Sequence, residues 1–293
     1  MFEIENNNIN IITFVDFFDF TYSFISYTII NENRRSNKFP GFSYFRIYGI
    51  PGCNKEKEKG MSTAGLRIFK DFQRPDPELI EAFRGIPVAN ISDCMGRLFV
   101  MASRIQPMGR MQTVVGPAFT VKAAIGDNLL FNKAIALAKP GDVIVVDALG
   151  DMNQSVCGDL MYQFARKKGI AGFVVDGVVR DVKFLHEHDF PVYARGVTAR
   201  GPYKNGFGEI NTDIACGNQV VHPGDIITAD EDGVLVIRPQ DAQILLEKAR
   251  AVVEREKRFD QIIADGKWEQ SKGFEMIENQ VAKCGFEIYE TME

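Results

Sequence analysis

Cysteine and histidine are scarce in this 293-residue chain. The five cysteines are widely spaced and include no C-x-x-C pair: Cys53, Cys94, Cys157, Cys216 and Cys284. This pattern argues against a zinc site or a disulfide framework and fits a reducing cytoplasm, where we expect the protein to be. Two of the three histidines, His186 and His188, are two positions apart on a predicted helix, so they point to different sides and make a poor metal pair.

Positive charge is not in excess either. The chain has 34 Lys and Arg against 39 Asp and Glu, a net charge of −5 at pH 7. A general nucleic-acid binder would carry a basic face, so we expect no nucleic-acid partner. Small anionic substrates are not excluded, because they respond to the local field. The length and the hydrophobic content of 45% allow one or two domains with ample core.

Residues 1–60 contain no alanine and no leucine, although the rest of the chain is rich in both. They hold nine of the 23 phenylalanines and end in the charge run NKEKEKG, directly before Met61. We expect this N-terminal extension to lie outside the folded body, either disordered or not native. Our hypothesis is that Met61 is the natural start; peptides from before Met61 in mass spectra of the native protein would refute it.

One stretch of this extension, IITFVDFFDFTYSFISYTII, is about long enough to span a membrane. Asp16 and Asp19 lie in its middle, where a charge is costly. The chain also begins with the acidic MFEIE, where a signal peptide is basic. An anchor or a signal peptide is therefore the less favoured alternative, and we expect no membrane partner.

Beyond this extension, helical and strand patterns alternate. A helix capped by Asp76 comes first, and a second short helix is predicted after Ser92 and Asp93. The strand pattern VVGPAFTVKAA is interrupted by Gly116-Pro117, which indicates an edge strand or a bulge.

A helix over NLLFNKAIALA and a buried strand over VIVVDAL follow, separated by a Pro-Gly-Asp turn. Later come a short strand, FPVYARGVT, a Gly-rich loop over 201–208 and a hairpin in HPGDIITADEDGVLVIRP. Residues 241–265 predict a long amphipathic helix, and residues 267–293 form a tail with a weak helical pattern. This alternation indicates an α/β body of one domain, with a mixed sheet flanked by helices.

The stretch 157–189 reads as helix, turn, strand, turn, helix. DLMYQFARKK predicts a helix closed by the glycine that follows it, and IAGFVVD predicts a strand buried on both faces. We expect Asp176-Gly177 to form a turn, and Arg180 and Asp181 to lie in the first turn of the next helix.

This stretch offers groups for an anion and for a metal ion. Gly158 precedes a helix N-terminus, so we expect the N–H groups of Leu160 and Met161 to be unpaired and available to an anion. Arg180 and Asp181 come just past a buried strand, where open α/β sheets place their ligands. An Arg fork suits a carboxylate, and an Asp is a hard oxygen ligand for Mg²⁺ or Mn²⁺. A carboxylate beside a carbonyl would fit that pair, although the two residues alone also fit a surface ion pair at a helix start.

Asp159, twenty intervening residues and Arg180-Asp181 match the D-x20-R-D signature of the RraA-like family. The chain resembles this family in further blocks that occur in family order, including VGPAFTVKAAIGDNLLFNKAIALAKPGDVIVVDALGD and FPVYARGVTARGP, over about residues 72–266. The family contains the class II pyruvate aldolases, which cleave 4-hydroxy-4-methyl-2-oxoglutarate and 4-carboxy-4-hydroxy-2-oxoadipate. It also contains the regulator of ribonuclease activity A.

The resemblance implies a fold, an assembly and a reaction. The fold would be a swivelling β/β/α domain over residues 61–266, assembled as homotrimers or homohexamers. The reaction would be metal-dependent retro-aldol cleavage of a 4-hydroxy-2-oxo acid to pyruvate, with oxaloacetate decarboxylation as a side activity. The cofactor would be a divalent cation, Mg²⁺ or Mn²⁺.

The resemblance also implies roles for single residues. Those that would hold pyruvate are Gly158, Asp159, Leu160, Met161 and Arg180. Asp181 would bind the metal directly, and Asp159 would act through metal-bound water. A glutamate from the late helix of a neighbouring subunit would complete the site; Glu256 is the best match, with Glu254 the alternative. By pattern alone, Glu256 fits a solvated helix face.

Two other functions stay open. The chain could be a non-catalytic interaction protein, like the ribonuclease regulator of the same family. Asp159 together with Arg180 and Asp181 favours the enzyme, because a pure binding module has no need of this set. A methyltransferase is disfavoured, since no Gly-rich nucleotide loop follows a first strand.

Overall fold

The structure of the protein is a computed structural model that describes residues 63–110, 113–289 and 291, together with the backbone of three strands before residue 31. The chain divides into two compact units, Met1–Gly60 and Met61–Glu293. In the first unit, β1 (Phe2–Asn6), β2 (Ile9–Phe14) and β3 (Tyr27–Ile30) form an antiparallel sheet. The predictions that concern Asp16, Asp19 and the NKEKEKG run lie outside the described residues.

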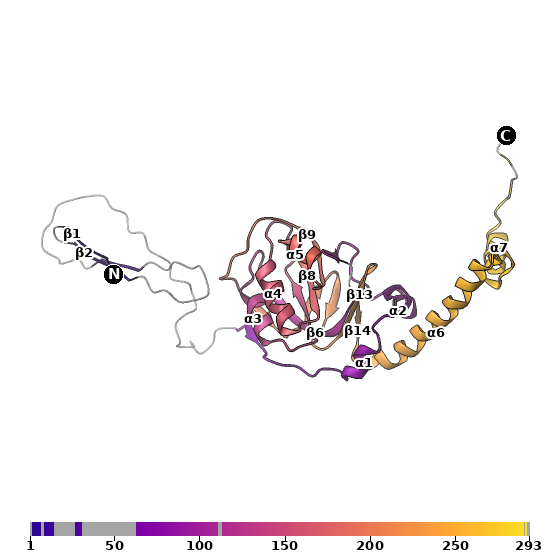
Figure 1. Cartoon of the computed structure of the whole chain (residues 1–293), viewed down its shortest axis with the longest axis horizontal. Helices are drawn as coiled ribbons and strands as arrows, with labels where there is room; N and C mark the ends of the chain where they lie inside the picture. The colour runs from indigo at the N-terminus through magenta and orange to yellow at the C-terminus, as the bar shows by residue number, and fades with distance from the viewer. Residues whose placement is uncertain are drawn as a thin grey trace. The chain divides into compact units, whose positions relative to one another are not determined.

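A nine-stranded mixed sheet forms the centre of the second unit (Figure 1). Its main path runs β14-β13-β6-β7-β8-β9-β5, and β10 joins β6 to the edge strand β4. Strands β6 to β9 are parallel, whereas β13 and β10 run antiparallel to β6. The strands are β4 (Leu66–Ile68), β5 (Gln106–Pro107), β6 (Val114–Ala123), β7 (Val143–Asp147), β8 (Gly172–Val179), β9 (Val192–Val197), β10 (Gly208–Ile210), β13 (Ile226–Asp230) and β14 (Gly233–Ile237), and the separate hairpin is β11 (Ile214–Cys216) with β12 (Gln219–Val221).

Helices cover one face of the sheet and one of its ends. Phe131 of α3, Tyr162 of α4 and Leu185 of α5 pack on the face formed by β6, β7 and β8. The β11–β12 hairpin packs on the opposite face, and α1, α2 and the first half of α6 pack against β13 and β14. The helices are α1 (Pro77–Glu81), α2 (Val88–Cys94), α3 (Leu129–Leu137), α4 (Asp159–Lys168), α5 (Val182–Glu187), α6 (Pro239–Ala264), the 3₁₀ helix η1 (Trp268–Gln270) and α7 (Lys272–Cys284). This arrangement confirms the predicted mixed sheet flanked by helices.

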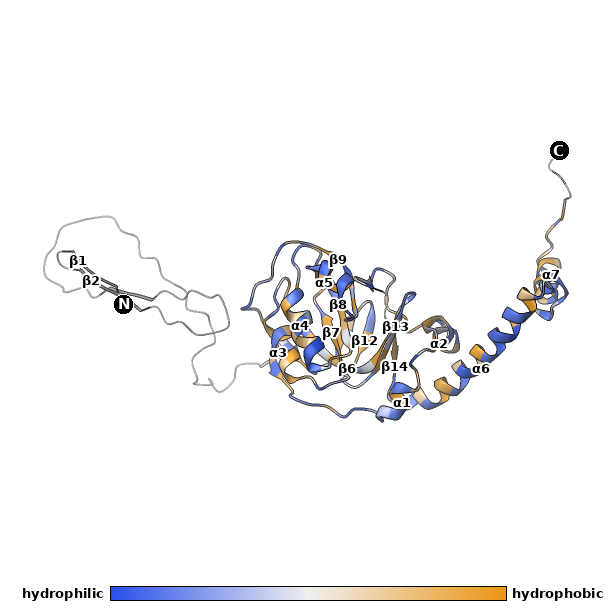
Figure 2. Ribbon diagram, viewed as in Figure 1, coloured by the Kyte–Doolittle hydropathy of each residue, from blue (hydrophilic) through white to orange (hydrophobic). Residues whose placement is uncertain are grey.

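Strands β7 and β8 are buried at every position, which explains their apolar sequences. Figure 2 shows these hydrophobic strands beside helices whose faces are mixed. Phe173 of β8 is fully buried, with ring centroids 4.8 Å from Phe131 and 4.9 Å from Phe190. Burial of one such side chain contributes about 1.5–3 kcal/mol to stability. In the described part of the chain, no helix is both long enough and apolar enough to cross a bilayer.

The prediction of an edge strand or bulge at Gly116-Pro117 is wrong. β6 is central, with β13 on one side and β7 on the other. The ladder with β7 begins only at Ala118, so the missing N–H of Pro117 lies before that ladder starts. Gly116 is needed here because a Cβ atom would lie 2.3 Å from the carbonyl oxygen of Gly141.

The predicted turn at Asp176-Gly177 is also wrong, because β8 continues through it to Val179. An Asp-Gly pair is typical of turns, but here Asp176 is opposite Asp147 of β7, and a Cβ on Gly177 would lie 2.9 Å from that of Ala148. The close approach selects the glycine. Similarly, α2 begins at Val88, before Ser92 and Asp93, rather than after them.

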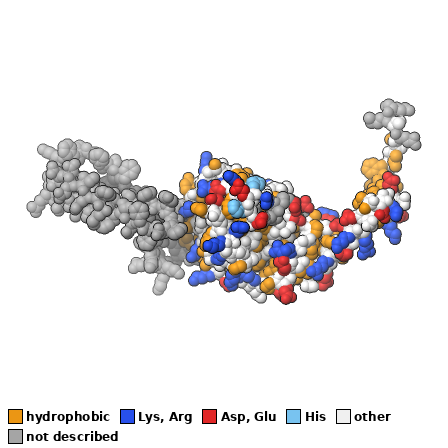
Figure 3. Space-filling view, in the orientation of Figure 1, with side chains coloured by type: hydrophobic (Ala, Val, Ile, Leu, Met, Phe, Trp, Pro, Cys, Tyr) orange, Lys and Arg blue, Asp and Glu red, His pale blue; other side chains and the backbone are white. Residues whose placement is uncertain are grey.

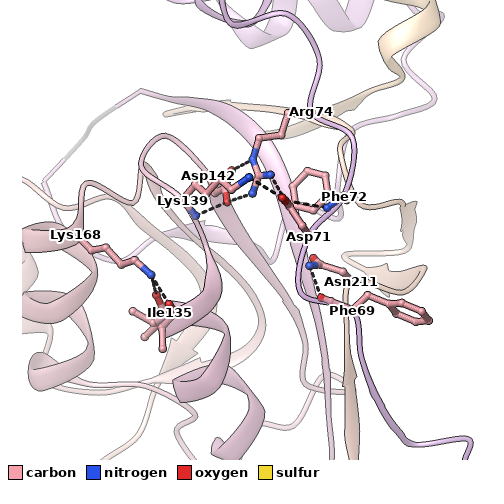
Figure 4. Close-up of polar contacts among 10 residues, drawn as sticks. Phe69, Asp71, Phe72, Arg74, Ile135, Lys139, Asp142, Lys168 and Asn211 are labelled. Atoms are coloured by element: carbon pink, nitrogen blue, oxygen red, sulfur yellow. Dashed lines mark hydrogen bonds and ion pairs between the residues drawn. The ribbon is translucent and has the colours of Figure 1, made fainter.

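A strap of residues 69–74 crosses the body and is tied down by charge (Figure 4). The guanidinium of Arg74 donates to both carboxylate oxygens of Asp142, at 2.7 and 2.6 Å, and lies 4.1 Å from the ring centroid of Phe72. Lys139 and Arg74 both bond Asp71, and together they hold the pKa of that carboxyl well below its usual range. The strap thus closes on the turn between α3 and β7.

Replacing Arg74 tests this strap. Arg74→Met leaves the Asp142 carboxylate, only 1% exposed, without its charged partner. We expect the free energy of unfolding, measured by urea denaturation, to fall by about 3 kcal/mol. The matched control is Arg84→Met, which breaks an ion pair between side chains that are 46% and 60% exposed and should cost less than about 1 kcal/mol. Equal losses in the two variants would contradict the role of the strap.

Candidate active site

The predicted site residues come from two turns that meet at the carboxyl edge of the sheet. One turn leads into α4 through Gly158, whose backbone is extended, and the other follows β8 through Arg180 and Asp181. The prediction that Arg180 and Asp181 lie just past a buried strand is confirmed. They do not lie in the first helical turn, however: α5 starts at Val182, and Asp181 precedes it in the left-handed conformation, with φ 57° and ψ 38°.

The two turns touch through the carboxylate of Asp181. Its Oδ2 accepts a hydrogen bond from the N–H of Asp159 at 3.1 Å and lies 3.3 Å from Nε of Arg180. A Cβ on Gly158 would lie 2.3 Å from this oxygen, and a Cβ on Gly201 would lie 3.2 Å from Nη1 of Arg180. Two glycines therefore make room for the ion pair. The side chains of Arg180 and Asp181 are 42% and 38% exposed, so both can reach a ligand.

The prediction of unpaired amides at the start of α4 is wrong. The N–H of Leu160 donates to Oδ1 of Asp159 at 2.7 Å, and the N–H of Met161 donates to the carbonyl of Gly158 at 3.0 Å. The Leu160 amide is paired because Asp159, in the first turn, turns its carboxylate back onto the helix end, whereas the Met161 amide is paired within the main chain. An anion would reach the Leu160 amide only where the Asp159 carboxylate moves away.

The structure does not bring Glu256 to Asp181 within one chain. Glu256 accepts a hydrogen bond from Nδ2 of Asn90 in α2, and Glu254 pairs with Lys257 at 2.6 Å. α6 packs against α1 and α2, while α4 lies at the other end of the sheet (Figure 1). The role of Glu256 in a neighbouring subunit stays a prediction.

The donor set fits a magnesium-type ion better than a zinc-type ion. Among the described residues, no group of three or more His, Cys, Asp or Glu side chains is placed to hold a metal. Mg²⁺ needs no such cage, because it is commonly held by one or two carboxylates with water and substrate oxygens completing its shell. Asp181, with Asp159 beside it, supplies such oxygens, and Gly158 leaves the space next to Oδ2 open.

A second charged group lies at the same edge of the sheet, on the β11–β12 side, and was missed at the level of sequence. Asp147, at the end of β7, faces Asp176 within β8. Arg195 bonds Asp176, whose other oxygen accepts the N–H of Gly217 at 2.9 Å. Nζ of Lys122 lies 3.9 Å from Asp147. The signal was present, because two buried strand patterns each end in Val-Val-Asp.

Asp147 is the carboxylate of this group whose charged form is disfavoured by burial. Burial raises the pKa of Asp147 above its ordinary value, and the negative charge of Asp176 raises it further, against the N–H of Leu149 and the charge of Lys122. The group binds the β11–β12 hairpin through the N–H of Gly217, but it also buries the Asp147 carboxylate, whose charged form is disfavoured there.

Gly158→Ala tests the contact between the two turns. The added Cβ would displace the ends of the Asp181 and Arg180 side chains, so we expect the fold to remain and the affinity for Mn²⁺, measured by calorimetry, to fall about tenfold or more. Gly196→Ala is the control, since its Cβ would meet nothing closer than 3.5 Å. Unchanged affinity in Gly158→Ala would contradict the geometry.

Asp147→Asn tests the buried carboxylate through pH. Because the folded state binds the Asp147 proton more tightly than the unfolded state does, stability should fall as pH rises from about 4 through the raised pKa. The variant lacks this loss. Across that pH interval, the unfolding free energy of the wild type should therefore decrease relative to that of Asp147→Asn as pH increases. If the two proteins show the same dependence of unfolding free energy on pH, the pKa of Asp147 is not raised.

Known proteins resemble this chain in sequence and in fold. The family model described as RraA-like, Aldolase/RraA, matches residues 88–236. A Halalkalibacterium halodurans protein named "Putative 4-hydroxy-4-methyl-2-oxoglutarate aldolase" is 42% identical over 188 residues, which are 64% of this chain and 90% of that protein.

Two solved structures are similar as well. One is an uncharacterized protein from Pseudomonas syringae pv. tomato, with a TM-score of 0.61 and 26% identity over 67% of this chain and 92% of that one. The other is Streptomyces coelicolor RraAS2, described as an unusual member of the RNase ES inhibitor RraA protein family, with a TM-score of 0.57 and 27% identity over 66% of this chain and all of that one. The family model, the close relative and the shared fold together show that this chain belongs to the RraA-like family.

Proposed function

We propose that the protein is a divalent-metal-dependent lyase that cleaves a 4-hydroxy-2-oxo acid by a retro-aldol reaction and releases pyruvate. The observation that carries this proposal is the meeting of Arg180 and Asp181 with the start of α4 at Gly158. This places a guanidinium fork beside an accessible carboxylate, as a ligand with adjacent carboxylate and carbonyl groups requires. The name of the Halalkalibacterium halodurans relative supports the same reaction class.

The side chains at the site would divide the work. Arg180 binds the substrate carboxylate and stabilises the negative charge that develops on the pyruvate fragment as the carbon–carbon bond breaks. Asp181 holds the metal ion, Mg²⁺ or Mn²⁺, which when bound supplies Lewis-acid chemistry. Asp159, across the hydrogen bond from Asp181, orients the water that removes the proton of the substrate hydroxyl. The backbone of residues 158–161 lines the other side of the substrate.

The same charge development would decarboxylate oxaloacetate, which also leaves a pyruvate fragment. Loss of carbon dioxide and loss of an oxo acid both place the electron pair on the carbon next to the carbonyl. We therefore expect oxaloacetate decarboxylation as a side activity of the same residues.

The catalytic unit in this proposal is residues 61–266, assembled as a homotrimer or homohexamer in the cytoplasm. The partial exposure of Arg180 and Asp181 in one chain supports a site completed by a neighbour, with Glu256 of its α6 as the added carboxylate and Glu254 as the alternative. The tail beyond residue 266 contains η1 and α7, and none of the α7 side chains is buried in one chain.

A non-catalytic interaction protein is the second candidate, favoured by the similarity to Streptomyces coelicolor RraAS2. The partner in that case would be a protein. On the face seen in Figure 3, acidic and basic side chains are intermixed.

Pyruvate release separates the two candidates. We expect release from 4-hydroxy-4-methyl-2-oxoglutarate and from oxaloacetate with Mg²⁺, and none with EDTA. Asp181→Ala should abolish turnover and metal dependence together, and Arg180→Ala should lower turnover about 100-fold or more. Glu187→Ala, which removes an exposed carboxylate from the far end of α5, is the control.

Full activity in Asp181→Ala would end this mechanism. No release from either compound by folded protein with Mg²⁺ would instead favour the interaction protein.

A further inference from the structure

Asp181 needs support to keep the conformation that the site depends on. A non-glycine residue in the left-handed region is strained and persists only where its surroundings fix it. No side-chain hydrogen bond caps α5 at Asp181 in the described structure. Besides the contacts of its carboxylate with the Asp159 N–H and Arg180, the support comes from the main chain of the turn and from the residues packed against it.

The main chain of Arg180 is bonded on both sides to the segment that enters α4. Its N–H donates to the carbonyl of Cys157 at 3.0 Å, and its carbonyl accepts a hydrogen bond from the hydroxyl of Tyr162 at 2.8 Å. That carbonyl belongs to the peptide that leads into Asp181. The hydroxyl of Tyr162 thus sets the plane of the peptide whose far side carries the candidate metal ligand.

Tyr162 itself cannot move easily. It is fully buried, its ring is stacked on Phe184 at 6.0 Å, and the rings of Phe173 and Phe190 lie at 6.3 Å. Because protein interiors are closely packed, the Tyr162 ring could move only if its packing with these neighbours were disrupted. Burial also raises the pKa of the Tyr162 hydroxyl well above that of an ordinary phenol.

We propose that Tyr162 is a positioning residue for the site: through the Arg180 carbonyl, its hydroxyl holds Asp181 in the left-handed conformation, with the carboxylate over Gly158. Tyr162 does not touch the substrate. This inference rests on the proposed function, and it differs from a structural role because it ties one buried hydroxyl to the affinity of the metal site.

The test variant is Tyr162→Phe, which keeps the ring and its packing and removes the hydroxyl. With the hydroxyl go its hydrogen bond to the Arg180 carbonyl at 2.8 Å and its two longer contacts, with the carbonyl of Cys157 at 3.5 Å and with the Cys157 thiol at 3.7 Å. Binding of Mn²⁺ to the full chain is measured directly, by electron paramagnetic resonance of the free ion. We expect the Kd for Mn²⁺ to rise about tenfold and turnover of the metal-loaded protein to fall at least as much.

Tyr193→Phe is the matched control, because Tyr193 is equally buried but lies in the cluster on the opposite face of the sheet. Both variants should unfold at lower urea concentrations than the wild type. Only Tyr162→Phe should weaken Mn²⁺ binding, and an unchanged Kd in Tyr162→Phe would overturn the inference.

A crystal structure of Tyr162→Phe gives a readout that needs neither metal nor activity. We expect Asp181 to leave the left-handed region and its carboxylate to move out of hydrogen-bonding distance of the Asp159 N–H. A turn that is unchanged in the variant overturns the inference, whatever the activity. A wild type that binds no Mn²⁺ would refute the proposed function instead, and the crystal structure alone would then decide the role of Tyr162.

Discussion

Parallel pairing of β7 with β8 determines where the charged residues of this molecule lie. Parallel strands end at one common edge, so the chain leaves both β7 and β8 there and enters α4 and α5 from the same side. This is how Asp159 and Asp181, more than twenty residues apart, come to share a hydrogen bond. At that edge, the β11–β12 hairpin bonds Asp176 through Gly217, and Tyr162 bonds the carbonyl of Arg180. The strap of residues 69–74 instead binds Asp142, at the opposite end of β7.

The charged residues on the two sides of this edge differ in burial and in how firmly they are paired. On the hairpin side, Asp147 and Asp176 are buried and are balanced internally by Arg195, Lys122 and backbone N–H groups. On the α4 side, Arg180 and Asp181 are partly exposed and only loosely paired, since Nε and Oδ2 are 3.3 Å apart. The buried charges are held by fixed partners within the fold, whereas Arg180 and Asp181 remain free to exchange a partner for a ligand.

The periodicity of the sequence predicted most elements, and the D-x20-R-D spacing predicted which residues meet. The sequence alone could not predict where the turns lie or how their polar groups are paired. Asp176-Gly177 is typical of a turn, yet Arg195 and Gly217, distant in sequence, satisfy Asp176 inside a strand. The pairing of the Leu160 amide was not predictable either, because it depends on the side-chain rotamer of Asp159. Tyr162 was read only as part of a helix, since a hydroxyl's acceptor is known only from the fold.

The length of α6 has a consequence for where Glu256 lies. Its 26 residues make a rod about 39 Å long, and Glu256 lies about 25 Å from its start. Its buried residues, among them Ala242, Leu246 and Ala249, all lie in its first part, and Glu256 beyond them is bonded by Asn90 of α2. One residue inserted into α6 would rotate the part of the helix beyond it by about 100° and shift that part by about 1.5 Å along the axis. The number of residues between the buried part of α6 and Glu256 therefore sets whether this carboxylate faces Asn90 of α2.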